Sequence, residues 1–167
     1  FFYTYLRYNI TCFTICGGAA EAMKEGDYMS GYIAVIIMLL ALSAFFSATE
    51  TAYTSLNRIK MKNLAADDDR RAEKVLKLDA NYDKLLSTIL VGNNIANICL
   101  TSVATVMCVK LYGANLGATV STVGVTIVVL IFGEISPKTI AKENADAFAM
   151  FSAPAVNALV ILFTPVT

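Results

Sequence analysis

Residues 31–56, which read GYIAVIIMLLALSAFFSATETAYTSL, decide the fold of this chain. The first half of this stretch, as far as Phe46, is almost entirely apolar and has no charged residue. A helix of about 20 apolar residues crosses the hydrocarbon core of a bilayer, so the stretch predicts a membrane-spanning helix. The second half carries several hydroxyl side chains and Glu50, whose carboxylate is costly in a membrane unless it faces protein or water.

Further apolar stretches downstream have the length of membrane helices. Residues 85–112 and 116–135 predict a second and a third span, and the Gly-Ala-Asn sequence at 113–115 predicts a short turn between them. A fourth apolar segment, 145–163, is interrupted by Pro154. We expect this segment to be a short re-entrant, interfacial or tilted helix rather than a full span.

Residues 57–84 are polar, and they separate the first two spans. Their leucine and valine spacing predicts a helix-turn-helix pair at the membrane surface. Their basic residues are Arg58, Lys60, Lys62, Arg70, Arg71, Lys74, Lys77 and Lys84. Because loops rich in Lys and Arg stay in the cytoplasm, this loop and the C-terminus are expected to be cytoplasmic and the N-terminus outside.

The composition bounds the class of protein. Of 167 residues, 57% are hydrophobic, which is high for a soluble domain, and 13 basic residues balance 13 acidic ones, so nothing suggests a nucleic-acid partner. The absence of histidine removes the commonest general base, and no nucleophile or phosphate-binding motif is present, so we expect no enzyme. We predict an all-α membrane protein, with an extension of unknown status at 1–28 and a transmembrane domain at 29–167.

Polar oxygen-bearing side chains recur within the predicted spans. Ser43 and Ser47 are one helical turn apart on the first span, Asn93 and Asn97 repeat this spacing on the second, and Glu134 ends the third. Hydroxyl, amide and carboxylate oxygens are ligands for Mg²⁺ or another hard cation. The spacing therefore predicts that three spans present oxygen ligands.

Pro137 gives a reason to expect irregular backbone next to Glu134. A proline has no N–H to donate, and its ring crowds the carbonyl four residues earlier, which here belongs to Gly133. The helix is therefore expected to be broken or π-bulged over 133–137. Lipid offers no hydrogen-bond donor to the freed carbonyl, and a cation beside Glu134 would satisfy it.

These polar groups also have structural interpretations. Serines and threonines in membrane helices often bond to their own helix or to a neighbouring helix. An ion pair with Arg58 or Lys60 is the alternative for Glu50. An ordinary i,i+4 pair with Lys138 is the alternative for Glu134.

Three motifs carry a resemblance to a known family. They are FFSATETA at 45–52, VGNNIAN at 91–97 and GEISPK at 133–138. In order and spacing they resemble the transmembrane domain of the CNNM/CorB/CorC magnesium transporters, over about residues 29–167. The resemblance implies a homodimer in the lipid bilayer, with three spans per protomer and a belt of juxtamembrane helices.

The resemblance also implies a site. One largely dehydrated Mg²⁺ per protomer would lie in an inward-facing acidic cavity. The matching ligands would be Ser47, Asn93, Asn97 and Glu134, with the Gly133 carbonyl nearby.

Three further residues, Ser43, Glu50 and Thr51, would line the cavity or hold a coupling Na⁺. The family is regarded as exporting Mg²⁺ from the cell in exchange for Na⁺, which places the chain in the plasma membrane. Its cytoplasmic CBS modules, which bind ATP with Mg²⁺, are not in this sequence. Two alternatives stay open: a membrane-anchored Mg²⁺ sensor that regulates other transporters, and a helix bundle whose polar residues only join helices.

Overall fold

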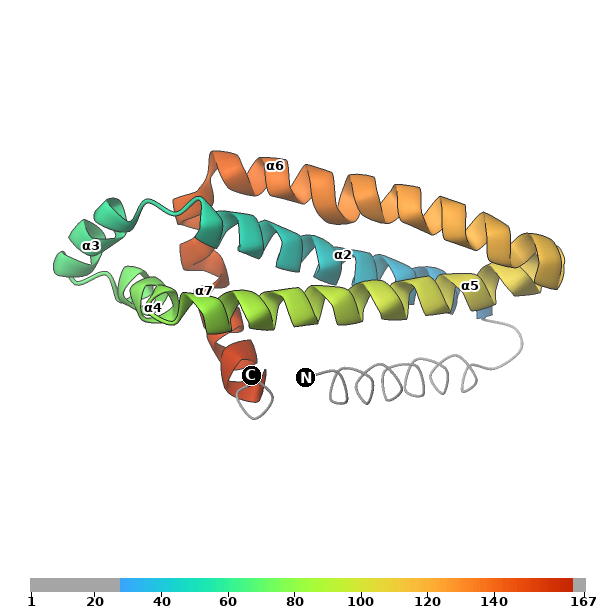
Figure 1. Cartoon of the computed structure of the whole chain (residues 1–167), viewed down its shortest axis with the longest axis horizontal. Helices are drawn as coiled ribbons and strands as arrows, with labels where there is room; N and C mark the ends of the chain where they lie inside the picture. The colour runs from blue at the N-terminus through green and yellow to red at the C-terminus, as the bar shows by residue number, and fades with distance from the viewer. Residues whose placement is uncertain (1–27, 164–167) are drawn as a thin grey trace. The chain divides into compact units, whose positions relative to one another are not determined.

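The structure is a computed structural model that describes residues 28–163, and the expected extension at 1–28 lies outside these residues except for Tyr28. Every element between 28 and 163 is helical, which confirms the all-α prediction (Figure 1). In chain order the elements are α2 (Tyr28–Thr54), α3 (Arg58–Ala66), α4 (Arg70–Asp79), α5 (Tyr82–Val128), η1 (Val129–Ile135), α6 (Ser136–Glu143) and α7 (Ala145–Phe163).

Three helical stretches in this part of the chain are long and apolar enough to cross a membrane: Met29–Thr54, Tyr82–Glu143 and Ala145–Leu162. In the most apolar window of each of the first two, only 17% of the residues are buried within the chain. A soluble protein would bury such surface, whereas a membrane helix leaves it to lipid or to another chain. The chain is therefore an integral membrane protein.

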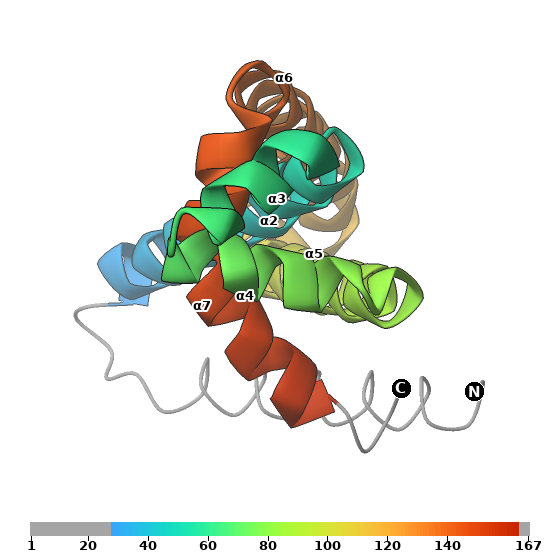
Figure 2. The same ribbon diagram turned by 90° about the vertical axis from the view of Figure 1, so that its left-hand side faces the viewer.

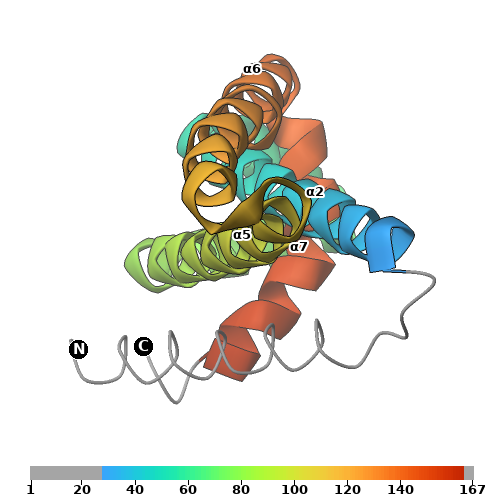
Figure 3. The same ribbon diagram turned by 90° about the vertical axis from the view of Figure 1, so that its right-hand side faces the viewer.

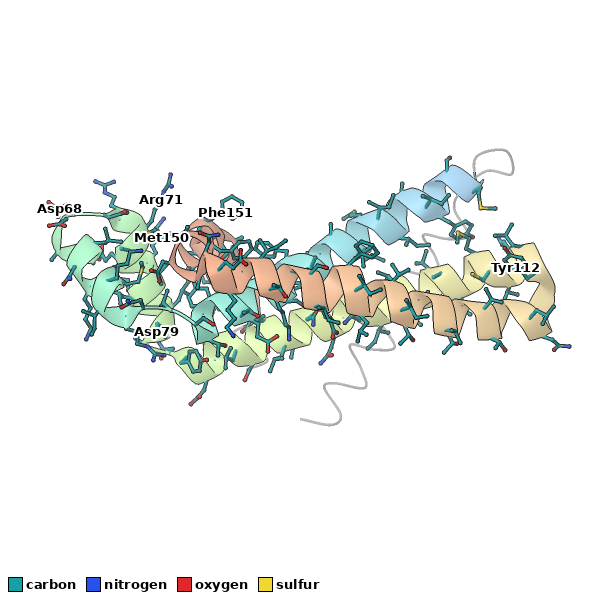
Figure 4. All side chains as sticks on the ribbon, turned by 90° about the horizontal axis from the view of Figure 1, so that it is seen from above. Asp68, Arg71, Asp79, Tyr112, Met150 and Phe151 are labelled. Atoms are coloured by element: carbon teal, nitrogen blue, oxygen red, sulfur yellow. The ribbon has the colours of Figure 1, made fainter. Side chains whose placement is uncertain are left out.

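The chain reverses direction inside α5, at Gly113. This residue has φ 81° and ψ 168°, a conformation that is essentially restricted to glycine. Residues 82–112 and 114–128 thus form two helical segments, as the Gly-Ala-Asn sequence predicted, and Figure 3 looks onto the turn that joins them. The hydroxyl oxygens of Thr105 and Ser121 lie 3.0 Å apart across the two segments. Tyr112, just before the turn, is labelled in Figure 4.

The helices contribute to two compact units, and each is described by itself. In the described residues the first unit contains 28–43 and 93–133, and the second contains 44–92 and 134–163. The apolar core of the second unit is built from α2, α3, α4, α5 and α7. Its fully buried larger side chains are Tyr53, Met61, Val75, Leu85, Ile89 and Val156.

A close helix contact in the second unit involves the glycine of the VGNNIAN motif. A Cβ at Gly92 would lie 2.6 Å from a ring atom of Phe46, which is closer than real contacts allow. Glycine at this position therefore lets α5 approach the aromatic ring on α2.

The predicted helix-turn-helix pair is present as α3 and α4, which pack against each other, and α4 also packs against α7 (Figure 2). Side-chain oxygens begin both helices: Asn57 accepts from the Lys60 N–H at 3.1 Å, and Asp69 accepts from the Arg71 N–H at 2.8 Å. Asp68, with φ 65°, lies in the connecting loop (Figure 4). Placement of the pair at the membrane surface stays a prediction.

Ion pairs fix the ends of α3 and α4. Arg58 donates to both carboxylate oxygens of Asp79, at 2.7 and 3.0 Å. These hydrogen bonds, together with the charge of Asp79, raise the pKa of the Arg58 guanidinium. On α4, the hydrogen bond and charge of Lys77 lower the pKa of the Glu73 carboxyl. The bidentate pair links the start of α3 to the end of α4.

The fourth apolar segment is the helix α7. It continues through Pro154, whose missing N–H leaves the carbonyl of Met150 without its usual helical partner. The Phe151 ring points away from the ribbon and is 70% exposed (Figure 4). By length and composition α7 is long enough to span a membrane, but its depth there stays a prediction.

Candidate cation site

A polar cluster in the first unit joins α2 to α5. The Ser43 side chain is fully buried, and its hydroxyl oxygen lies 3.0 Å from Oδ1 of Asn93 and 2.8 Å from Oδ1 of Asn97. The two asparagines reach the same hydroxyl because they are one helical turn apart. Asn94 lies between them in sequence and is exposed. Asn93 and Asn97 therefore both contact the side chain of Ser43 on α2.

Two arrangements satisfy the polar groups of this cluster. A serine hydroxyl has one hydrogen, so it can donate to only one of the two amide oxygens at a time. In the amide orientations of the structure, the other close oxygen–oxygen contact has no hydrogen between its atoms. Turning one amide so that its NH₂ group faces the hydroxyl makes the second contact a hydrogen bond, whereas the orientation in the structure brings three oxygens together, as hard cations require.

Backbone of the third span lies against the same hydroxyl. A Cβ at Gly133 would be 3.2 Å from the Ser43 hydroxyl oxygen and 3.4 Å from a methyl carbon of Val129. Gly133 belongs to η1, a π-helix, which agrees with the distortion expected from Pro137 at the start of α6. In a regular α-helix the Pro137 ring would crowd the Gly133 carbonyl, which gives a local reason for the π-helix.

Glu134 directly follows Gly133 in the chain and is partly exposed. Its expected i,i+4 partner, Lys138, instead forms an ion pair with Glu50, with Nζ and Oε2 3.2 Å apart. Among the described residues, the Glu134 side chain has no hydrogen-bond or ion-pair partner. The structural alternative for Glu134 is therefore wrong, and its carboxylate is available to a ligand.

Glu50 forms an ion pair, as its structural alternative predicted, but the partner is neither Arg58 nor Lys60. Arg58 pairs with Asp79, and Lys60 pairs with Asp146 at 2.9 Å, so neither base is the partner of Glu50. Lys138 takes that place. Nothing in the sequence spacing indicated this pair, because it joins residues of two helices that are far apart in the chain.

Ser47 and Thr51 continue the α2 stripe into the second unit. Ser47 is fully buried, and its hydroxyl oxygen has no hydrogen-bond partner. Thr51 donates to the Ser47 carbonyl at 3.1 Å, which is the self-bonding alternative for a threonine in a membrane helix. Ser43 is thus the serine that contacts the asparagines. The family resemblance had instead implied Ser47 as the serine ligand.

The first three predicted spans contain two carboxylates, Glu50 and Glu134. The part of the chain that the structure describes contains no group of three or more His, Cys, Asp or Glu side chains that could hold a metal ion. A cation held here would have mostly neutral oxygen ligands. Such a site suits a hard ion that must also be released.

Comparison with known proteins places these residues in a family. Residues 34–167 match the family model described as "Cyclin M transmembrane N-terminal domain", CNNM. The chain is 38% identical over 137 residues to a UPF0053 protein of Haemophilus influenzae, covering 82% of this chain and 32% of that protein. It is 38% identical over 124 residues to the UPF0053 inner membrane protein YfjD of Escherichia coli, covering 74% and 29%.

A plant relative shows similar coverage. A chloroplastic DUF21 domain-containing protein of Arabidopsis thaliana is 32% identical over 133 residues, which is 79% of this chain and 20% of that protein. The chain thus spans about a third or less of the length of these curated relatives.

Proposed function

This chain belongs to the CNNM family of transmembrane domains, and from that premise we propose that it carries Mg²⁺ across the membrane. The observation that supports this most is the convergence of the Ser43 hydroxyl with the side-chain oxygens of Asn93 and Asn97. Mg²⁺ gives up its water reluctantly, so a site that strips this water needs several oxygens already in position.

The ion would take its neutral ligands from these side chains and from the Gly133 carbonyl. The carboxylate of Glu134, next in the chain and unpaired among the described residues, would supply the negative charge. The family resemblance adds Ser47 as a ligand, and its buried hydroxyl oxygen has no hydrogen-bond partner. A single charged ligand supports release, because each added carboxylate would hold a divalent ion more tightly.

The setting of the transport step is also a proposal. We take the family resemblance to imply a homodimer, an inward-facing acidic cavity, and Mg²⁺ efflux from the cell driven by Na⁺ entry. The loop at 57–84 and the C-terminus would lie in the cytoplasm, and the membrane would be the plasma membrane. Regulation by ATP with Mg²⁺ would belong to CBS modules elsewhere in the protein. No enzymatic step is part of the proposal.

The proposal is tested by Mg²⁺ flux into and out of proteoliposomes. Glu134→Ala is expected to abolish flux while the protein keeps its unfolding temperature and oligomeric state. Glu143→Ala is the matched control, because this exposed glutamate at the end of α6 is outside the proposed ligand set. Normal flux in Glu134→Ala would disprove the assigned role. Mg²⁺ binding without flux in any variant would favour the sensor function instead.

A further inference from the structure

The ion pair between Glu50 and Lys138 has no role in the ligand set proposed above. It joins α2 to α6 within the second unit, with Nζ and Oε2 3.2 Å apart. The side chain of Glu50 is 28% exposed and that of Lys138 is 42% exposed. Partial burial raises the cost of leaving this carboxylate unpaired, so a cation beside it stabilises the contact between α2 and α6.

Neither of the nearest bases in sequence can take the place of Lys138 without losing a partner of its own. Arg58 is bound through two hydrogen bonds to Asp79, and Lys60 is paired with Asp146. The ammonium group of Lys138 is therefore the cation that the fold supplies to Glu50.

Because Lys138 pairs with Glu50, it does not form an ion pair with Glu134. An uninterrupted α-helix would set these two side chains on one face, four residues apart. Here Glu134 lies within the π-helix η1, Pro137 follows, and Lys138 pairs across to α2. One lysine thus neutralises one of the two glutamates in the family motifs and leaves the other open.

We propose that Lys138 is a tethered counter-cation that occupies Glu50 and limits the carboxylates open to a transported cation to Glu134. This rests on the proposed function only in taking Glu134 as the charged ligand. A cation that approaches Glu50 has to displace the ammonium group first. Lys138 therefore sets how strongly this unit holds a divalent ion, without itself being a ligand.

Binding of Mg²⁺ alone provides the test, measured as the Mg²⁺ concentration that gives half of the maximal rise in unfolding temperature of the purified protein. Lys138→Gln frees Glu50 and is expected to lower this concentration about tenfold, as one added charged contact would. Lys138→Arg keeps a cation at Glu50 and is expected to leave this Mg²⁺ concentration unchanged. Lys142→Gln, a loss of charge one turn later on α6, is the matched control and is expected to leave it unchanged as well.

The double variant Glu50→Gln with Lys138→Gln leaves no charge at either of these two positions, so it is expected to fold and to return to the wild-type Mg²⁺ concentration. The double variant can be measured even if Lys138→Gln alone is unstable, so the proposal stays testable. Unchanged binding in Lys138→Gln, an equal shift in Lys142→Gln, or tight binding that persists in the double variant would each overturn the proposal.

The outcome is separable from that of the proposed function. A wild-type protein with no Mg²⁺ protection and no flux would count against transport. Lys138→Gln would still decide the role of Lys138, because the freed Glu50 is expected to create Mg²⁺ protection that the wild type lacks.

Discussion

At the scale of single residues, Ser43 and Ser47 lie one turn apart on α2 but have different surroundings. The Ser43 hydroxyl is shared between Asn93 and Asn97, whereas the equally buried Ser47 hydroxyl has no partner. A buried polar group without a partner destabilises a fold unless a ligand completes it. The two serines are therefore expected to respond differently to removal of the hydroxyl.

Ser43→Ala leaves the side-chain amides of Asn93 and Asn97 without their hydroxyl partner and is expected to destabilise the Mg²⁺-free protein by about 1–3 kcal/mol. Ser47→Ala removes an unpartnered group and is expected to leave that stability unchanged or slightly raised. Thermal unfolding in detergent, with and without Mg²⁺, measures both effects. Loss of Mg²⁺ protection in Ser47→Ala alone would make Ser47 the ligand, and a stable Ser43→Ala would contradict the importance of the shared hydroxyl.

At the scale of elements, glycines control how closely the two segments of α5 approach after the reversal at Gly113. A Cβ at Gly117 would lie 2.5 Å from the carbonyl oxygen of Cys108 and 2.6 Å from Cα of Val109. Both contacts are with backbone, which cannot move aside as a side chain can. Gly124, further along the same segment, has nothing within 4 Å of such a Cβ.

Gly117→Ala is expected to destabilise the protein by about 1–3 kcal/mol, because the second segment must shift away from the first. Gly124→Ala is the matched control on the same segment. It is expected to be neutral or to stabilise by up to about 1 kcal/mol through helix propensity. Unfolding curves of the two variants check this difference, and equal stabilities would mean that the segments do not pack as closely as described.

Sequence patterns predicted these elements well where the cause is local. The run of apolar residues, the turn at 113–115 and the irregular helix before Pro137 each follow from the chemistry of neighbouring residues. Which serine contacts the asparagines and which base pairs with Glu50 depend on how helices rotate against each other. That rotation is set by close approaches such as Gly92 against Phe46, which no single stretch of sequence reveals.

At the scale of the whole molecule, apolar surface is left uncovered by the chain itself. The three candidate spans bury only 17%, 17% and 28% of their most apolar windows. Lipid covers such surface, and a second copy in the proposed homodimer would cover part of it. The basic residues concentrated at 57–84 predict the direction of insertion, with this loop on the cytoplasmic side.

The orientation of the chain leads to a prediction about two labelled positions in Figure 4, Arg71 on α4 and Tyr112 before the turn. Residues 82–112 form one helical segment of about 45 Å at 1.5 Å per residue, longer than a hydrocarbon core of about 30 Å. Its two ends should therefore lie on opposite sides of the membrane. Both side chains are exposed, so a cysteine at either position is open to a reagent.

In a background without the native cysteines, a membrane-impermeant maleimide added to intact cells is expected to label Tyr112→Cys and to leave Arg71→Cys unlabelled. Inverted membrane vesicles should give the reverse pattern, and labelling of both in detergent controls for reactivity. Labelling of Arg71→Cys from outside would invert the orientation, and the proposed cation site would then open to the wrong compartment for efflux. Labelling of both positions from the same side would mean that residues 82–112 do not cross the membrane, which would remove the second span on which Asn93 and Asn97 depend.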